Sequence, residues 1–381
     1  MKYQQSLSLL AALAIGLLSS CSSEDSETKD IGLIPIVLTS GNTTRALNAQ
    51  DTQLATSQTV YVWCKHTGTD NDYFRAWTLT SNGTGGFTGN TVYYPKDGKN
   101  IDFYALHGNI TSPTITEQSL SSGIPTSTTV GTALPTTITH QVMADQRTDI
   151  NYSKSDLLST KVVNCGPNGH TGGDSYSVNL PFAHLLTRVE VAVNTGEDLL
   201  PSDVDFVGLL NVKTQTTLSP ITYSNATATI GSTATTPAVD TLKMHPVKPY
   251  NSTNGVVAEC IIPKQTLVGD GTIKVIFIQL YDGKRFFYWP LSNLAFNADA
   301  TSYRIELSVS KVELTGYRLG VAQWDWTTPT EDLPYYFPKE MEPTQGGIES
   351  PDPLTPGLEW EYGGDNDDEV NKGSEWNPNH E

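Results

Sequence analysis

The sequence predicts an all-β protein, and three observations lead to that prediction. Short alternations of apolar and polar residues recur along the chain, separated by turn dipeptides such as Asn82-Gly83 and Asp97-Gly98. No segment has both the periodicity and the length of a convincing helix. Charged residues make up only 17% of the chain, below the roughly 25% typical of soluble domains. With 381 residues the chain is long enough for two ordinary domains.

Strand-like runs occur in both halves of the chain. They are rich in β-branched and aromatic side chains and end at turn residues. These runs are residues 59–63, 74–79, 101–106, 204–210, 272–280, 285–289 and 303–309. In the last run the odd-numbered residues, Tyr303 to Val309, are apolar and the others are polar. This pattern is typical of a sheet that has one face in the core and one face exposed to solvent. We therefore expect two successive β-sandwiches, at residues 46–178 and 179–326.

The run of residues 178–193 changes phase within itself. Leu180 and Phe182 alternate in one phase, whereas Val189 and Val191 alternate in the other. A shift by one residue exchanges the two faces of a strand. We therefore expect a bulge or a change of strand near His184.

The amino terminus has the features of an export signal. Lys2 precedes the apolar run of residues 9–18, which is short for a bilayer span. The sequence Leu18-Ser19-Ser20-Cys21 resembles a lipobox, so residues 1–20 would be removed and Cys21 would carry lipid. More than one acyl chain anchors a protein without a transmembrane helix. Apart from this lipid, no cofactor is expected.

The last 55 residues differ in kind from the rest. Residues 327–381 hold 14 Asp and Glu residues and two Lys residues, a net charge of −12 out of the total of −18. Frequent prolines exclude regular elements there. We expect an exposed, extended acidic tail, and the overall acidity makes nucleic acid an improbable partner.

The remaining cysteines are Cys64, Cys165 and Cys260, an odd number that cannot all pair. Buried free thiols are the expected state. Cys64 and His66 with Cys165 and His170 form at most a weak metal motif, so no metal site is assigned. Likewise, the acidic cluster at residues 365–369 lacks the Gly and Glu that a calcium loop requires.

No motif for catalysis is present, so no catalytic residue is assigned and the chain is not expected to be an enzyme. A surface hydrolase stays open only because folding can bring two carboxylates together. His184 lies in an apolar run and is expected to be structural. Trp77 and Trp289 could stack on sugar but are expected first in the core.

Taken in order, several features of the chain resemble the fimbrillins, the subunits of the type V pili of Bacteroidales. These features are Cys21 of the lipobox, the apolar residues 34–38 followed by residues 43–46, residues 93–95 and 101–105, residues 155–158, the run 180–186, residues 303–309 and residues 317–326. The resemblance covers about residues 18–326.

The resemblance implies two transthyretin-like sandwiches and a lipidated precursor that is cut after an arginine at the cell surface. The matching position is Arg45, which would leave Ala46 as the new amino terminus and make residues 21–45 a propeptide. The first strand, with Ile34, Ile36 and Leu38, would leave with the lipid. The open groove would then accept a strand from another copy or a related pilin by β-strand addition.

In the family the donor comes from the carboxyl-terminal strands. The matching residues here are Tyr317, Leu319, Val321, Trp324 and Trp326. Because the chain continues past them, a donor within residues 333–360, or a tip or accessory role, stays open.

The implied location is the outer membrane, the cell surface and the fimbrium. The implied partners are other subunits, the membrane, a surface protease and an adhesion receptor. The acidic residues 22–27 are either a surface-export signal of the kind found in Bacteroidales lipoproteins or a solvated tether. The alternative function is a surface glycan-binding lipoprotein of a nutrient-uptake system.

Overall fold

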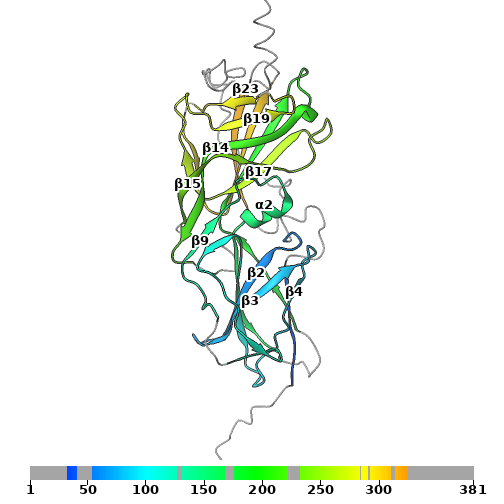
Figure 1. The fold of residues 1–381 in the computed structure, drawn as a ribbon, viewed down its shortest axis with the longest axis vertical. Coiled ribbons are helices and arrows are strands. Elements are labelled where there is room, and N and C mark those ends of the chain that lie inside the picture. Colours follow the sequence, from blue (N-terminus) through cyan, green and yellow to red (C-terminus); the bar gives the residue numbers. More distant parts are fainter. Residues whose placement is uncertain are drawn as a thin grey trace, which may run out of the picture.

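The computed structural model describes residues 32–40, 54–126, 131–167, 176–221, 223, 232–283, 285–290, 292–309 and 314–324. Almost all regular structure in these residues is β-strand, which confirms the all-β prediction (Figure 1). The exceptions are the helix α2 (Asp149–Ser155) and the 3₁₀ turn η1 (Pro201–Asp203).

The short helix α2 is an addition that the sequence pattern does not single out. The helix has seven residues, too few for a helical periodicity to stand out in the sequence. Its start is nevertheless encoded locally, because Oγ1 of Thr148 accepts a hydrogen bond from the backbone N–H of Asn151 at 3.3 Å.

The lower half of the molecule in Figure 1 is built around a six-stranded sheet. Its strands, in order, are β12 (Ala183–His184), β10 (Leu158–Cys165), β5 (Ile101–His107), β2 (Thr59–His66), β3 (Asp72–Ser81) and β4 (Phe87–Gly89). Separate pairs are formed by β1 (Ile36–Ser40) with β11 (Tyr176–Leu180), and by β7 (Leu120–Ser121) with β8 (Ile124–Pro125).

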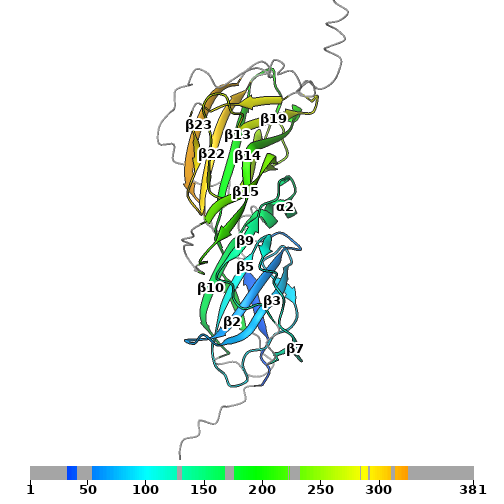
Figure 2. The same ribbon diagram turned by 60° about the vertical axis from the view of Figure 1, so that its left-hand side comes forward.

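Two further sheets, which Figure 2 shows side by side, lie mainly in the upper half. The first has the order β16 (His245–Pro246), β17 (Val256–Ile262), β13 (Thr187–Thr195), β22 (Thr301–Val309), β23 (Leu314–Gln323). The second has the order β20 (Arg285–Tyr288), β19 (Ile276–Leu280), β14 (Val204–Leu218), β9 (Ile138–Gln141), β6 (Ile110–Ser112), and β15 (Ser232–Lys243) also pairs with β14. A short ribbon joins β18 (Gln265–Leu267) to β21 (Leu294–Phe296).

Two clusters of buried side chains form the main cores. One lies in the lower half and includes Ile34, Val62 and Phe103. The other fills the space between the two upper sheets, and it also includes Trp63 and Leu106 of the lower sheet. The 15-residue strand β14 pairs with β19 of the upper half and with β9 from the first half of the chain. The division at residues 178 and 179 stays a prediction.

The predicted change of strand near His184 is confirmed. Strand β12 pairs with β10 of the lower sheet, whereas β13, two residues further on, pairs with β17 and β22 of an upper sheet. The change of phase in the sequence therefore marks the point where the chain moves from one sheet to another.

The predicted burial of one face of β22 is confirmed as well. Tyr303, Ile305, Leu307 and Val309 are all buried, and the three residues between them, Arg304, Glu306 and Ser308, are partly exposed.

The strand predicted at residues 272–280 begins only at Ile276. Oδ1 of Asp270 accepts hydrogen bonds from the backbone N–H groups of Thr272 and Ile273, at 2.8 and 3.1 Å. These bonds hold the preceding residues in a turn, a competing use of the backbone that hydrophobic patterning does not reveal.

Candidate functional site

Strand β1 lies in its own two-stranded ribbon on the lower core. It runs parallel to β11, with Ile36 opposite Tyr176 and Ser40 opposite Leu180. Its other edge is bonded to residues 85–94: the N–H of Ile36 donates to the carbonyl of Val92 at 2.9 Å, and the N–H of Ser40 donates to that of Gly85 at 2.8 Å. Both edges of the strand are thus engaged.

The two faces of this segment differ strongly. Ile34, Ile36 and Leu38 are 0%, 6% and 4% exposed and belong to the lower core, whereas Leu33 and Val37 are 40% and 39% exposed. Burial of each aliphatic side chain contributes about 1.5–3 kcal/mol, so these three together hold the segment by about 5–9 kcal/mol. Without the segment, β11 and residues 85–94 would expose unpaired backbone groups beside an apolar groove.

The other predicted processing positions cannot be placed. Cys21, Arg45 and Ala46 lie outside the described residues. Lipidation and cleavage stay predictions.

Strand β23, which contains part of the candidate donor segment, is the last strand of its sheet. It pairs antiparallel with β22, with Leu319 opposite Ile305 and Val321 opposite Tyr303. Leu319 and Val321 are partly buried and pack on the upper core. The side chain of Tyr317 and the whole of Trp326 lie outside the described residues.

Trp324 follows β23 and is 2% exposed. Its ring stacks on His184 with the centroids 3.7 Å apart, and Nδ1 of His184 lies 2.8 Å from Oδ2 of Asp156. His184 is therefore structural, as predicted. Among the candidate donor residues whose side chains the structure describes, Trp324 contacts a residue of the lower sheet, His184 of β12.

Three further histidines surround α2. Nε2 of His140 donates to the carbonyl of Ser155 at 2.8 Å, and Nε2 of His107 lies 2.8 Å from the carbonyl oxygen of Ser153. His245 stacks on Tyr152 with 4.8 Å between the centroids. Sequence reasoning had no signal for this grouping, because the histidines come from β5, β9 and β16.

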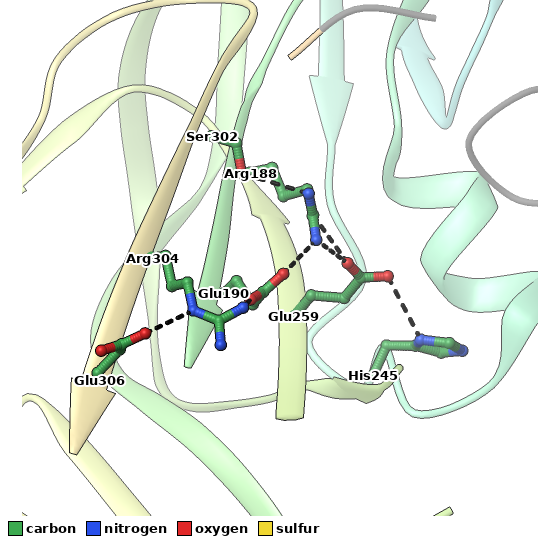
Figure 3. Close-up of polar contacts among 7 residues, drawn as sticks. All are labelled: Arg188, Glu190, His245, Glu259, Ser302, Arg304 and Glu306. Atoms are coloured by element: carbon green, nitrogen blue, oxygen red, sulfur yellow. Dashed lines mark hydrogen bonds and ion pairs between the residues drawn. The ribbon is translucent and has the colours of Figure 1, made fainter. Parts of the chain in front are cut away.

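A connected set of charged and polar side chains covers the outer face of the sheet that contains β13, β17 and β22 (Figure 3). Arg188 is fully buried and donates from Nε to Oε2 of Glu259 at 2.7 Å and from Nη2 to Oε2 of Glu190 at 2.6 Å. Nη1 of Arg188 donates to Oγ of Ser302 at 3.3 Å, and Arg304 pairs with Glu190. Buried charges need such complete pairing, which makes this network a structural element.

The network also shifts the ionisation of its members. Burial alone would raise the pKa of Glu259, but Arg188 and His245 hold it below its ordinary value. Burial alone would lower the pKa of His245, but Glu259 and Asp149 raise it. Nε2 of His245 lies 2.9 Å from Oδ1 of Asp149.

The cysteines are free and buried, as predicted. Burial raises the pKa of all three thiols, that of Cys165 to about 11, and the neighbouring Cys165 raises that of Cys64 further. Across the residues that the structure describes, no three His, Cys, Asp or Glu side chains are grouped to hold a metal. His170 and the acidic cluster at residues 365–369 lie outside them.

Trp77 and Trp289 are 3% and 8% exposed, as expected of core residues, and neither offers a free face for stacking on sugar. An open polar hollow of about 740 Å³ lies between the end of β2 at His66 and the loops that carry Asn71 and Asp97. Its described lining contains none of the residues predicted for lipidation, cleavage or strand exchange. In the described ranges no helix has the length and apolar character needed to cross a membrane.

The comparisons with known proteins identify the family of the chain. The fimbrillin-like family model matches residues 44–324, and the chain belongs to that family. It is therefore a fimbrial subunit of the cell surface, a class that assembles with other pilin subunits. The comparison with curated proteins found no match.

Three solved structures are similar in fold. A candidate cell adhesion protein from Bacteroides uniformis is 18% identical with a TM-score of 0.46, over 77% of this chain and 98% of that one. A candidate cell adhesion protein from Bacteroides ovatus is 14% identical with a TM-score of 0.46, over 78% and 98%. The tip fimbrial protein Mfa3 from Porphyromonas gingivalis, with a carboxyl-terminal truncation, is 8% identical with a TM-score of 0.38, over 77% and 100%.

Proposed function

We propose that this protein is a fimbrial subunit exported as a lipoprotein precursor with lipid on Cys21, and that it polymerises after cleavage between Arg45 and Ala46. The observation that carries the proposal is the way in which β1 is packed on the lower core. Residues 34–40, which include the strand, fill an apolar groove with the side chains of Ile34, Ile36 and Leu38, and the proposed cleavage position follows them closely in the sequence. Cleavage would cut their covalent link to the rest of the fold.

The departure of β1 creates the acceptor for a neighbouring subunit. A strand that enters the groove regains the hydrogen bonds to β11 and to residues 85–94, and its alternate side chains fill the three apolar positions. A head-to-tail contact of this kind does not close on itself and produces a filament. In this proposal the protein has a structural, non-enzymatic role and needs no cofactor beyond the lipid. The filament that it forms supports adhesion.

The test is to mix the purified precursor with a trypsin-like protease. We expect a new amino terminus at Ala46, found by mass spectrometry, and SDS-resistant ladders of oligomers. The matched control is Arg45→Gln, which should stay intact at this position and monomeric. A product that loses residues 1–45 and never polymerises would contradict the proposal.

We further propose that the donor segment contains Tyr317, Leu319, Val321, Trp324 and Trp326. The edge position of β23 supports this, because an end strand can leave its sheet by breaking pairs on one side only. Donation then requires β23 to separate from β22.

A disulfide between these strands tests the donor. Glu306 lies opposite Arg318 in the register of β22 and β23. The double variant Glu306→Cys with Arg318→Cys should fail to polymerise when oxidised and should recover on addition of reductant. If the oxidised protein polymerises normally, the donor is not β23. A donor within residues 333–360 would give this result.

A further inference from the structure

The sheet of β14, β19 and β20 has a second apolar face, directed away from the upper core. Phe206, Phe277, Phe287 and Trp289 form a separate cluster there, and each is at most 8% exposed. Gly208 makes room for this packing, since a Cβ atom at that position would lie 2.3 Å from Cε1 of Phe277. We call these four residues the outer aromatic cluster.

Four cationic side chains lie over the outer aromatic cluster. The cationic groups of Arg147 and Lys243 lie 5.3 and 5.1 Å from the ring centre of Phe206. Nζ of Lys274 lies 3.9 Å from the ring centre of Phe287, and the guanidinium carbon of Arg285 lies 5.6 Å from that of Phe277. Ring quadrupoles attract cations within about 6 Å, so the aromatic face gathers positive charge at the surface.

Two acidic side chains act on one of these cations. Asp145 pairs with Arg147 at 2.8 Å, and Asp205 also acts on Arg147. Arg285 donates from Nε to Oε1 of Gln279. A guanidinium has five N–H donors and a lysine ammonium has three, so a cation that rests on a ring can still bind a carboxylate.

We propose that the acidic carboxyl-terminal segment, residues 327–381, docks on this cationic face of its own chain. Charge complementarity carries the proposal. The segment holds 14 acidic residues and two lysines, whereas the rest of the chain has 27 acidic and 21 basic residues. It also places Trp360 between Glu359 and Glu361, so that a carboxylate and a ring can bind the same cation. The contact forms within a single precursor chain and therefore does not require the proposed polymerisation.

The segment is long enough to reach the face. It follows shortly after Trp324, and 55 residues can span well over 100 Å at about 3.3 Å per residue. Because exposed charges are screened beyond about 8 Å at physiological ionic strength, the contact should weaken strongly in salt.

Zero-length carbodiimide cross-linking of the full chain tests the proposal, since this reagent joins lysine to Asp or Glu only at contact. We expect cross-links from residues 331–375 to Lys243 and Lys274, identified by mass spectrometry, with at least a tenfold loss in 1 M salt. Lys161 is the matched control, because its ammonium also lies over a ring, 5.1 Å from the centre of Tyr104 in the other half of the chain.

A mixture of ¹⁴N- and ¹⁵N-labelled protein identifies the source of the segment. Cross-links within one label support docking in the same chain. Cross-links between labels would overturn it in favour of a second copy. Equal labelling of Lys161, or no cross-links to Lys243 and Lys274, would overturn the docking surface itself.

Discussion

His184 and Trp324 stack with their ring centres 3.7 Å apart, although 140 residues separate them in the sequence. His184 ends β12 of the lower sheet, whereas Trp324 follows β23 of an upper sheet. The pair therefore connects the end of the described chain to the point where the backbone passes from one sheet to the other.

Removal of the Trp324 ring should destabilise the protein. Truncation of a fully packed tryptophan leaves a cavity and costs about 3–5 kcal/mol. We expect Trp324→Ala to lower the free energy of unfolding by this amount in denaturant titrations. Val268→Ala is the control, because Val268 is 54% exposed and its loss should change stability by less than about 0.5 kcal/mol. Equal effects of the two variants would show that the stack contributes nothing.

The buried ion network should be intolerant of the loss of one partner. Glu259→Gln leaves Arg188 in the interior with reduced compensation, and breaking such a pair costs about 3–5 kcal/mol. The control Glu306→Gln removes a partly exposed partner of Arg304 and should cost less than about 1 kcal/mol. Thermal and denaturant unfolding of both variants measure the difference, and a change at Glu259 as small as that at Glu306 would contradict the structural role.

His140 should make the protein less stable in acid. Burial lowers the pKa of His140 from 6.5 to about 4, a shift that the carbonyl of Ser155 and Asp156 oppose and His107 reinforces. The unfolded chain therefore takes up a proton near pH 6.5, while the folded chain stays neutral until about pH 4. The stabilising contribution is complete above pH 6.5 and is lost as the pH falls towards 4, by up to about 3 kcal/mol.

The measurement is the free energy of unfolding between pH 7 and pH 4. In His140→Gln the decrease over this range should be smaller than in the unchanged protein. His66→Gln serves as the control, because His66 is only partly buried at the edge of an open hollow. Parallel pH curves for all three proteins would rule out His140 as the source.

The strength with which β1 binds its groove should set the rate of assembly after the proposed cleavage. Ile36→Ser removes apolar burial from the propeptide alone, and at about 1.5–3 kcal/mol this predicts release that is faster by a factor of about ten or more. Val37→Ser changes the neighbouring exposed position and should leave the rate almost unchanged. Time courses of oligomer ladders after protease addition compare the two, and identical rates would show that β1 does not limit exchange.

The regular structure could largely be read from the sequence because alternation is a local property of the chain. The wet and dry faces of residues 303–309 and the phase change at His184 follow from which side chains need burial, whatever strands lie beside them. The first strand is expected from the continuous apolar run of residues 34–38 and from the family resemblance, and the structure shows that Ile34, Ile36 and Leu38 are its buried side chains.

Only the tertiary structure decided which strands are neighbours. The parallel register of β13 and β22 brings Glu190 beside Arg304, 114 residues further along the chain, and the adjoining β17 adds Glu259. In the same way, three strands bring histidines to α2, and the outer aromatic cluster collects its cations from distant segments. Such contacts depend on long-range packing and not on local periodicity, so the sequence determined the strands and their buried faces, and the fold determined which charges meet.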